Sequence, residues 1–252
     1  MQINTNLEKQ DYLNAYKDMF SFLFRQPLLA AGFVFLCLVT EAIPFAWFPL
    51  KLASYAILIT LIVCVTSLHF RSGSLQGLGQ ELRFQQAVYL PAVVLILCLS
   101  WLGFVVADFL ISMVSVSSQD ATLLPSAAMA SQSSQGAGEL FVAVIATALI
   151  CLAQIMPLVL AHFCHGLGFS RAQGEKIWVS LMLQPKTLMA FIPISHVVPL
   201  GLMMQWNLMG LIVAFGALYS TFLLFIVFNI EPASPCEAKD IDMASGSGQA
   251  AG

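Results

Sequence analysis

The sequence predicts an all-α membrane protein with six transmembrane helices and amphipathic interfacial helices on the cytoplasmic side. Apolar residues make up 59% of the 252 residues and charged residues only 9%. At 1.5 Å per helical residue, six apolar stretches are each long enough to cross most of a hydrocarbon core about 30 Å thick. These stretches cover residues 27–48, 52–70, 88–114, 139–166, 186–205 and 208–229. The composition excludes a soluble protein, and no basic stripe suggests nucleic-acid binding.

The basic residues orient this bundle. If the N-terminus is cytoplasmic, nine of the ten Lys and Arg residues fall on the cytoplasmic side and only Lys51 faces outward. The nine are Lys9, Lys17, Arg25, Arg71, Arg83, Arg171, Lys176, Lys186 and Lys239. We therefore expect both termini in the cytoplasm. The expected organisation is an interfacial helix (1–26), a six-span domain (27–230) and a disordered acidic tail (231–252), with a flexible external loop at 115–138.

The N-terminal segment has the pattern of a helix lying in the membrane interface. Thr5 and Glu8 have the spacing of a capping box. Apolar residues then recur at intervals of three and four, which places them on one helical face. They are Leu13, Tyr16, Phe20 and Leu23. We expect this face to be buried in the interface, with docking to a partner as the alternative.

Similar patterns precede two later spans. Leu75, Leu78 and Leu82 mark a short apolar face before the third span. Before the fifth span, Ser170 and Gln173 resemble a capping box. The Gln-Pro pairs at 26–27 and 184–185 each follow such a segment, which suggests a parallel internal repeat.

The cysteines and the N-terminus suggest no extracytoplasmic processing. The six cysteines show no CxxC spacing, and five lie within predicted spans, so we expect no disulfide framework. The first apolar stretch is longer than a signal-peptide core, so we expect an uncleaved anchor.

A few polar residues within the spans are candidates for a transport site, because ionisable groups are costly in a bilayer. They are Glu41, Asp108, Gln154 and His196. Glu41 and Asp108 are predicted at similar depths near the outer surface, together with Glu139. The alternative to a transport site is a structural role. The carboxylates would then lie at the membrane interface, and His196 would pack beside Pro193.

Three histidines form the most metal-like pattern. His162 and His165 share a helical face, and His69 is predicted at a similar depth. Cys164 lies off that face and no nearby carboxylate supports the pair, so interfacial histidines are the alternative to a metal site. We expect no cofactor.

Part of the chain resembles a known family. The chain resembles an uncharacterised family of six-span bacterial inner-membrane proteins in four features. They are the two Gln-Pro junctions, the segment Met156-Pro-Leu-Val-Leu-Ala-His-Phe, the segment Phe169-Ser-Arg-Ala-Gln and Ser180. That family is distantly similar to the membrane domain that accompanies some glycerophosphodiester phosphodiesterases. The resemblance covers about residues 10–230. It implies the bacterial inner membrane and carries over no functional residues.

These observations lead to a functional expectation. The chain has no GxSxG motif and no glycine-rich phosphate loop. We therefore expect a non-enzymatic protein that acts through lipids or through a membrane-protein partner, which includes a second copy of itself. The alternative is a small transporter or proton-linked permeation path.

Overall fold

The regular elements in the described part of the chain are helices, which confirms the predicted all-α class. The computed structural model describes residues 3–44, 47–84, 94, 141, 144–196 and 209–232. The helices are α1 (Lys9–Arg25), α2 (Pro27–Glu41), α3 (Phe48–Ser72), the π-helix η3 (Cys151–Ile155), α6 (Met156–Gly166), α7 (Arg171–Met182), α8 (Pro185–Ser195) and α10 (Met209–Val227).

Helix α1 begins three residues later than predicted. The capping box is formed by Glu8 and Asp11, and the Asp11 carboxylate accepts the Glu8 N–H at 2.8 Å. The prediction of a box at Thr5 and Glu8 was therefore wrong, because a carboxylate at the position of Glu8 also caps a helix. Thr5 instead offers its carbonyl to the Gln184 side chain at 2.7 Å.

Both Gln-Pro pairs break the chain between two helices. Helices α1 and α2 meet at 99° around Gln26, and α7 and α8 meet at 77° around Gln184. A residue before proline avoids the helical region, whereas proline is well suited to the first position of the next helix. The predicted capping box of Ser170 and Gln173 at the start of α7 is confirmed.

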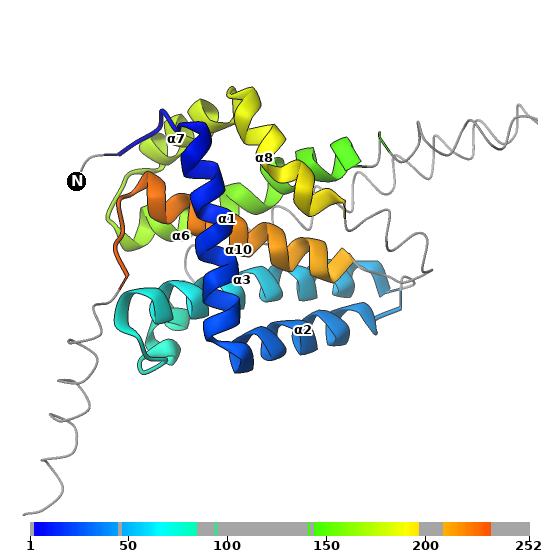
Figure 1. Cartoon of the computed structure of the whole chain (residues 1–252). Helices are drawn as coiled ribbons and strands as arrows, with labels where there is room; N and C mark the ends of the chain where they lie inside the picture. Colours follow the sequence, from blue (N-terminus) through cyan, green and yellow to red (C-terminus); the bar gives the residue numbers. More distant parts are fainter. Residues whose placement is uncertain are drawn as a thin grey trace, which may run out of the picture.

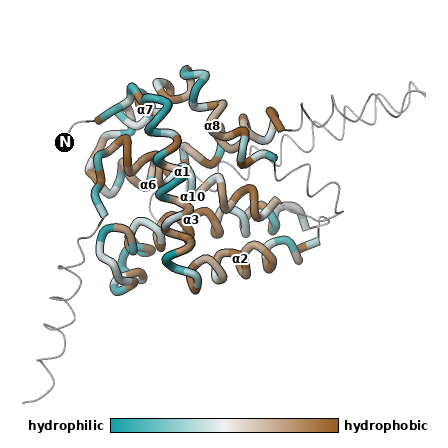
Figure 2. The backbone as a smooth tube through the Cα atoms, viewed as in Figure 1, coloured by the Kyte–Doolittle hydropathy of each residue, from teal (hydrophilic) through white to brown (hydrophobic). Residues whose placement is uncertain are grey.

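The long apolar helices run alongside one another, and α1 crosses them (Figure 1). Hydrophobic residues dominate α2, α3 and α10 (Figure 2). Helix α10 is the centre of the bundle and packs against α1, α2, α3, α6 and α8. Its buried aromatic residues form a cluster with those of its neighbours. The cluster includes Phe22, Phe70, Phe163, Phe222, Phe225 and Phe228.

One long helix contains a π-turn where α10 approaches it. In the helix Val144–Gly166, residues Cys151–Ile155 are π-helical, and the π-turn ends two residues before Pro157. Proline lacks the N–H that an α-helix needs, and a π-turn accommodates that loss. Gly216 of α10 faces this turn. A Cβ atom there would lie 3.1 Å from Ile155 Cδ1.

The described residues contain three helices that are long and apolar enough to span a membrane, or five if each bent pair counts as one span. The three are Leu50–Ser72, Val144–Gly166 and Met209–Val227. The predicted count of six stays a prediction. Apart from residue 94, the expected span 88–114 lies outside the described residues. The loop 115–138 and the tail beyond residue 232 lie outside them as well.

Candidate functional site

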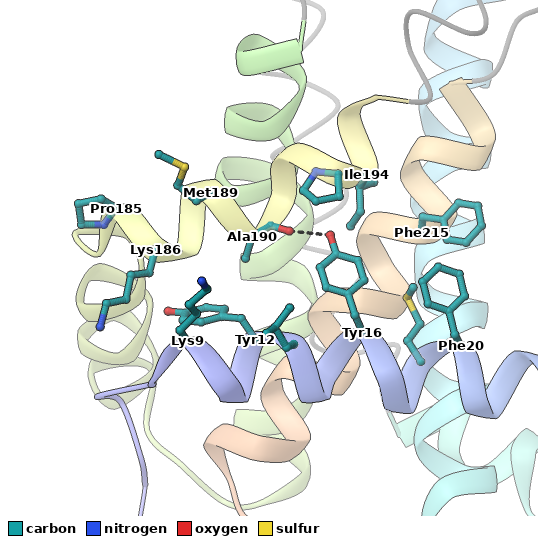
Figure 3. A pocket seen from close by; sticks show the side chains of 13 residues that line it. Lys9, Tyr12, Tyr16, Phe20, Pro185, Lys186, Met189, Ala190, Ile194 and Phe215 are labelled. Atoms are coloured by element: carbon teal, nitrogen blue, oxygen red, sulfur yellow. Dashed lines mark hydrogen bonds between the residues drawn. The ribbon is translucent and has the colours of Figure 1, made fainter.

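Two tyrosines of α1 reach across to α8 and hold the two helices together. The Tyr12 hydroxyl lies 2.8 Å from Thr187 Oγ1. The Tyr16 hydroxyl donates to the Ala190 carbonyl at 2.6 Å, shown as the dashed line in Figure 3. The Tyr16 ring also stacks on Tyr219 of α10, with centroids 4.1 Å apart. These contacts fix α1 relative to both α8 and α10.

Helix α1 has two apolar faces, one buried against the bundle and one exposed. The face buried against the bundle consists of Tyr12, Ala15, Met19 and Phe22. The stripe predicted to face the membrane interface lies next to this buried face, and two of its members are exposed: Leu13 at 51% and Phe20 at 44%. These two side chains lie beside an open groove between α1 and α8.

The groove has a volume of about 800 Å³ and an almost entirely apolar lining. This volume lies within the range of roughly 300–1,000 Å³ that is typical of small-molecule sites. Phe20 and Phe215 lie at one end (Figure 3). Lys9 and Lys186 lie at the other, on facing helices. The groove is therefore amphipathic along its length, with an apolar body and a cationic end.

Tyr12 lines the groove, and its buried position there affects its pKa. Only 4% of Tyr12 is exposed. Burial raises the pKa of Tyr12, while the hydrogen bond with Thr187 acts in the opposite direction and the nearby Asp11 adds to the rise. Tyr12 is therefore a neutral hydrogen-bonding group at neutral pH.

Glu41, at the end of α2, forms an ion pair and hydrogen bonds with two other helices. Its Oε2 lies 3.0 Å from Lys51 Nζ, and its Oε1 accepts from the Tyr55 hydroxyl at 2.8 Å. The Gly210 N–H also donates to Oε1. Glu41 thus connects α2, α3 and α10. It also neutralises Lys51, which is the basic residue predicted to face outward.

The other predicted transport residues show no common site within the described residues. Gln154 is exposed on η3. His196 is exposed at the end of α8, with its Nδ1 2.8 Å from the Ile192 carbonyl of its own helix. Asp108 and Glu139 lie outside the described residues. The transport hypothesis therefore stays a prediction without structural support.

The three candidate metal ligands have mainly aromatic neighbours. The His69 ring lies edge-on to Phe22, and the His165 ring lies 4.4 Å from that of Phe84. His162 is buried, with Nε2 4.0 Å from a carboxylate oxygen of Glu81. In the described part of the chain, no three His, Cys, Asp or Glu residues are placed to hold a metal ion together. The structure adds no support to the metal-site prediction.

The membrane-length apolar helices define an integral helical membrane protein. Comparison with known proteins gives nothing more specific: no family model, no curated protein and no solved structure matches this chain. The resemblance to the six-span inner-membrane family therefore stays an expectation from the sequence.

The sequence patterns do not indicate the groove. Lys9 and Lys186 stand out there only among the basic residues that orient the bundle. One signal was present. Tyr12 and Tyr16 are one turn apart on the first interfacial segment, and Thr187 follows the second Gln-Pro pair. Tyr12 and Thr187 are 175 residues apart, and helical periodicity alone does not pair residues at that separation.

Proposed function

We propose that this chain is a non-enzymatic, multi-pass protein of the bacterial inner membrane that acts by binding lipids or a protein partner. The observation that supports this function is the open groove between α1 and α8. Exposed apolar surface of this kind, rimmed by polar residues, marks interaction sites.

The proposed topology places both ends of the chain in the cytoplasm. Arg71 lies at the end of α3, and Arg171 lies at the start of α7. These positions agree with a cation-rich cytoplasmic face. Lys51 lies at the opposite end of α3, where Glu41 compensates its charge.

The polar side chains within the spans support a structural role for these helices. The hydroxyls of Thr40, Thr60 and Thr221 donate to carbonyls one turn earlier in their own helices. Such bonds satisfy a hydroxyl within the bilayer without creating a polar path.

A photo-crosslinking amino acid at Leu13 tests the proposed function in native membranes. Leu13 lines the groove, whereas Phe24 lies on the same helix, is 83% exposed and does not line it. We expect a discrete lipid or protein adduct from position 13 that is much weaker from position 24. Equal, unspecific adducts from both positions would contradict a binding role for the groove.

A further inference from the structure

We propose that the groove between α1 and α8 binds one anionic phospholipid of the cytoplasmic leaflet, with its phosphate between Lys9 and Lys186 and its acyl chains along the apolar lining. This inference rests on the proposed function and specifies its ligand. It follows from the shape, the charge and the membrane position of the groove.

The apolar part of the groove suits acyl chains. It follows α8 from Lys186 past Met189 to Ile194. Lys186 and Ile194 are eight residues apart and thus separated by about 12 Å along the helix axis. Met189 is 68% exposed. Helix α8 is the outbound arm of a bent pair that could form one membrane span. In the proposed topology, the α8 wall of the groove therefore runs from the interface towards the hydrocarbon region.

The cationic end suits a phosphate. Lys9 and Lys186 are both exposed, and neither forms an ion pair within the described residues. The acidic residues nearest to Lys9 in the sequence, Glu8 and Asp11, are engaged in the capping box of α1. Two ammonium groups at one end of an apolar groove complement the headgroup and tail of an anionic lipid.

The membrane position favours a lipid over a protein segment. Anionic lipids give the cytoplasmic leaflet a negative surface potential, which attracts juxtamembrane lysines. Lys186 is the second residue of α8, immediately after the break at Gln184. It therefore lies where the chain enters the membrane in the proposed topology. A protein ligand would have to supply both an anionic group and an extended apolar segment at this depth.

The test measures lipid binding to the purified full-length protein. Native mass spectrometry would compare phosphatidylglycerol with phosphatidylcholine for the wild type and for Lys9→Gln/Lys186→Gln. Lys17→Gln/Lys176→Gln is the matched control, because both lysines are exposed on α1 and α7 but do not line the groove. Circular dichroism would verify folding of each variant.

We expect one phosphatidylglycerol per chain, bound in preference to phosphatidylcholine. Loss of each groove lysine should weaken binding roughly fivefold, and loss of both roughly 25-fold. The control pair should change binding less than twofold. Equal binding of the two lipids, or equal losses in the two double variants, would overturn the inference.

A second pair of variants tests the apolar part of the groove independently of the lysines. Leu13→Glu places a carboxylate in the groove and should abolish retention of phosphatidylglycerol. Phe24→Glu places the same charge on an exposed site outside the groove and should leave retention intact. Retention by Leu13→Glu would overturn the inference.

If lipid binding fails while crosslinking at position 13 captures a discrete protein, the proposed function survives without this ligand. If both fail, the proposed function fails as well.

Discussion

Glu41 and Lys51 form an ion pair whose side chains are only 12% and 10% exposed. Removing one member of such a pair is costly, because it leaves the other charge buried without compensation. We expect Glu41→Gln to lower the free energy of unfolding by about 3 kcal/mol, within the range measured for broken buried pairs. Thermal unfolding in detergent measures this loss.

Two further variants define the cause. Glu41→Gln/Lys51→Met should be more stable than Glu41→Gln alone, because the double variant leaves no uncompensated charge. Glu175→Gln breaks the exposed pair with Arg171 and should cost less than about 0.5 kcal/mol. Equal losses from Glu41→Gln and Glu175→Gln would contradict the buried pair.

The buried hydroxyl of Tyr12 should make the free energy of unfolding depend on pH in the alkaline range. Its pKa is raised in the folded protein, mainly by burial, so the unfolded chain loses the tyrosine proton at a lower pH. This stabilisation is fully present below about pH 10, the ordinary value, and is lost as the pH rises towards the folded pKa. The stability of the wild type relative to Tyr12→Phe should therefore fall above about pH 10. A constant difference between pH 8 and 11 would be inconsistent with a buried Tyr12.

At the scale of elements, Gly216 sets how closely α10 approaches the π-turn. A Cβ atom at Gly216 would lie 3.1 Å from Ile155 Cδ1 and 3.3 Å from Cys151 Sγ. Gly216→Val should therefore separate the helices and cost about 1–3 kcal/mol, as overpacking does. Gly32→Val is the control, since a Cβ atom there meets nothing within 4 Å and the residue is also helical. Similar melting temperatures for the two variants would exclude close packing at Gly216.

The sequence predicted elements better than it predicted contacts between them. The cap at Ser170 follows from local chemistry, and this prediction was confirmed. The helix breaks at the Gln-Pro pairs have an equally local cause, because proline restricts the residue before it. The face of α1 that packs on the bundle was not predicted, because the stripe beside it is also apolar and fits the membrane interface. The pairing of Tyr12 with Thr187 depends on how distant helices pack, which local patterns do not specify.

At the scale of the whole molecule, α10 forms the buried centre. Two bent helix pairs, α1–α2 and α7–α8, pack against it through α1, α2 and α8. Helices α1 and α8 come from different pairs and enclose the groove (Figure 3). The two bends therefore have a joint consequence. They direct one apolar face of α1 towards α10 and leave another on the groove, whose cationic end faces the cytoplasm in the proposed topology.

Cysteine labelling tests this orientation most directly. In a variant without native cysteines, single cysteines would replace Lys9, Lys186 and Ala42, and a membrane-impermeant maleimide would be applied to each. All three positions are exposed. We predict that positions 9 and 186 react only in inside-out vesicles and that position 42 reacts in intact cells. Labelling of position 9 or 186 from outside the cell would contradict the account.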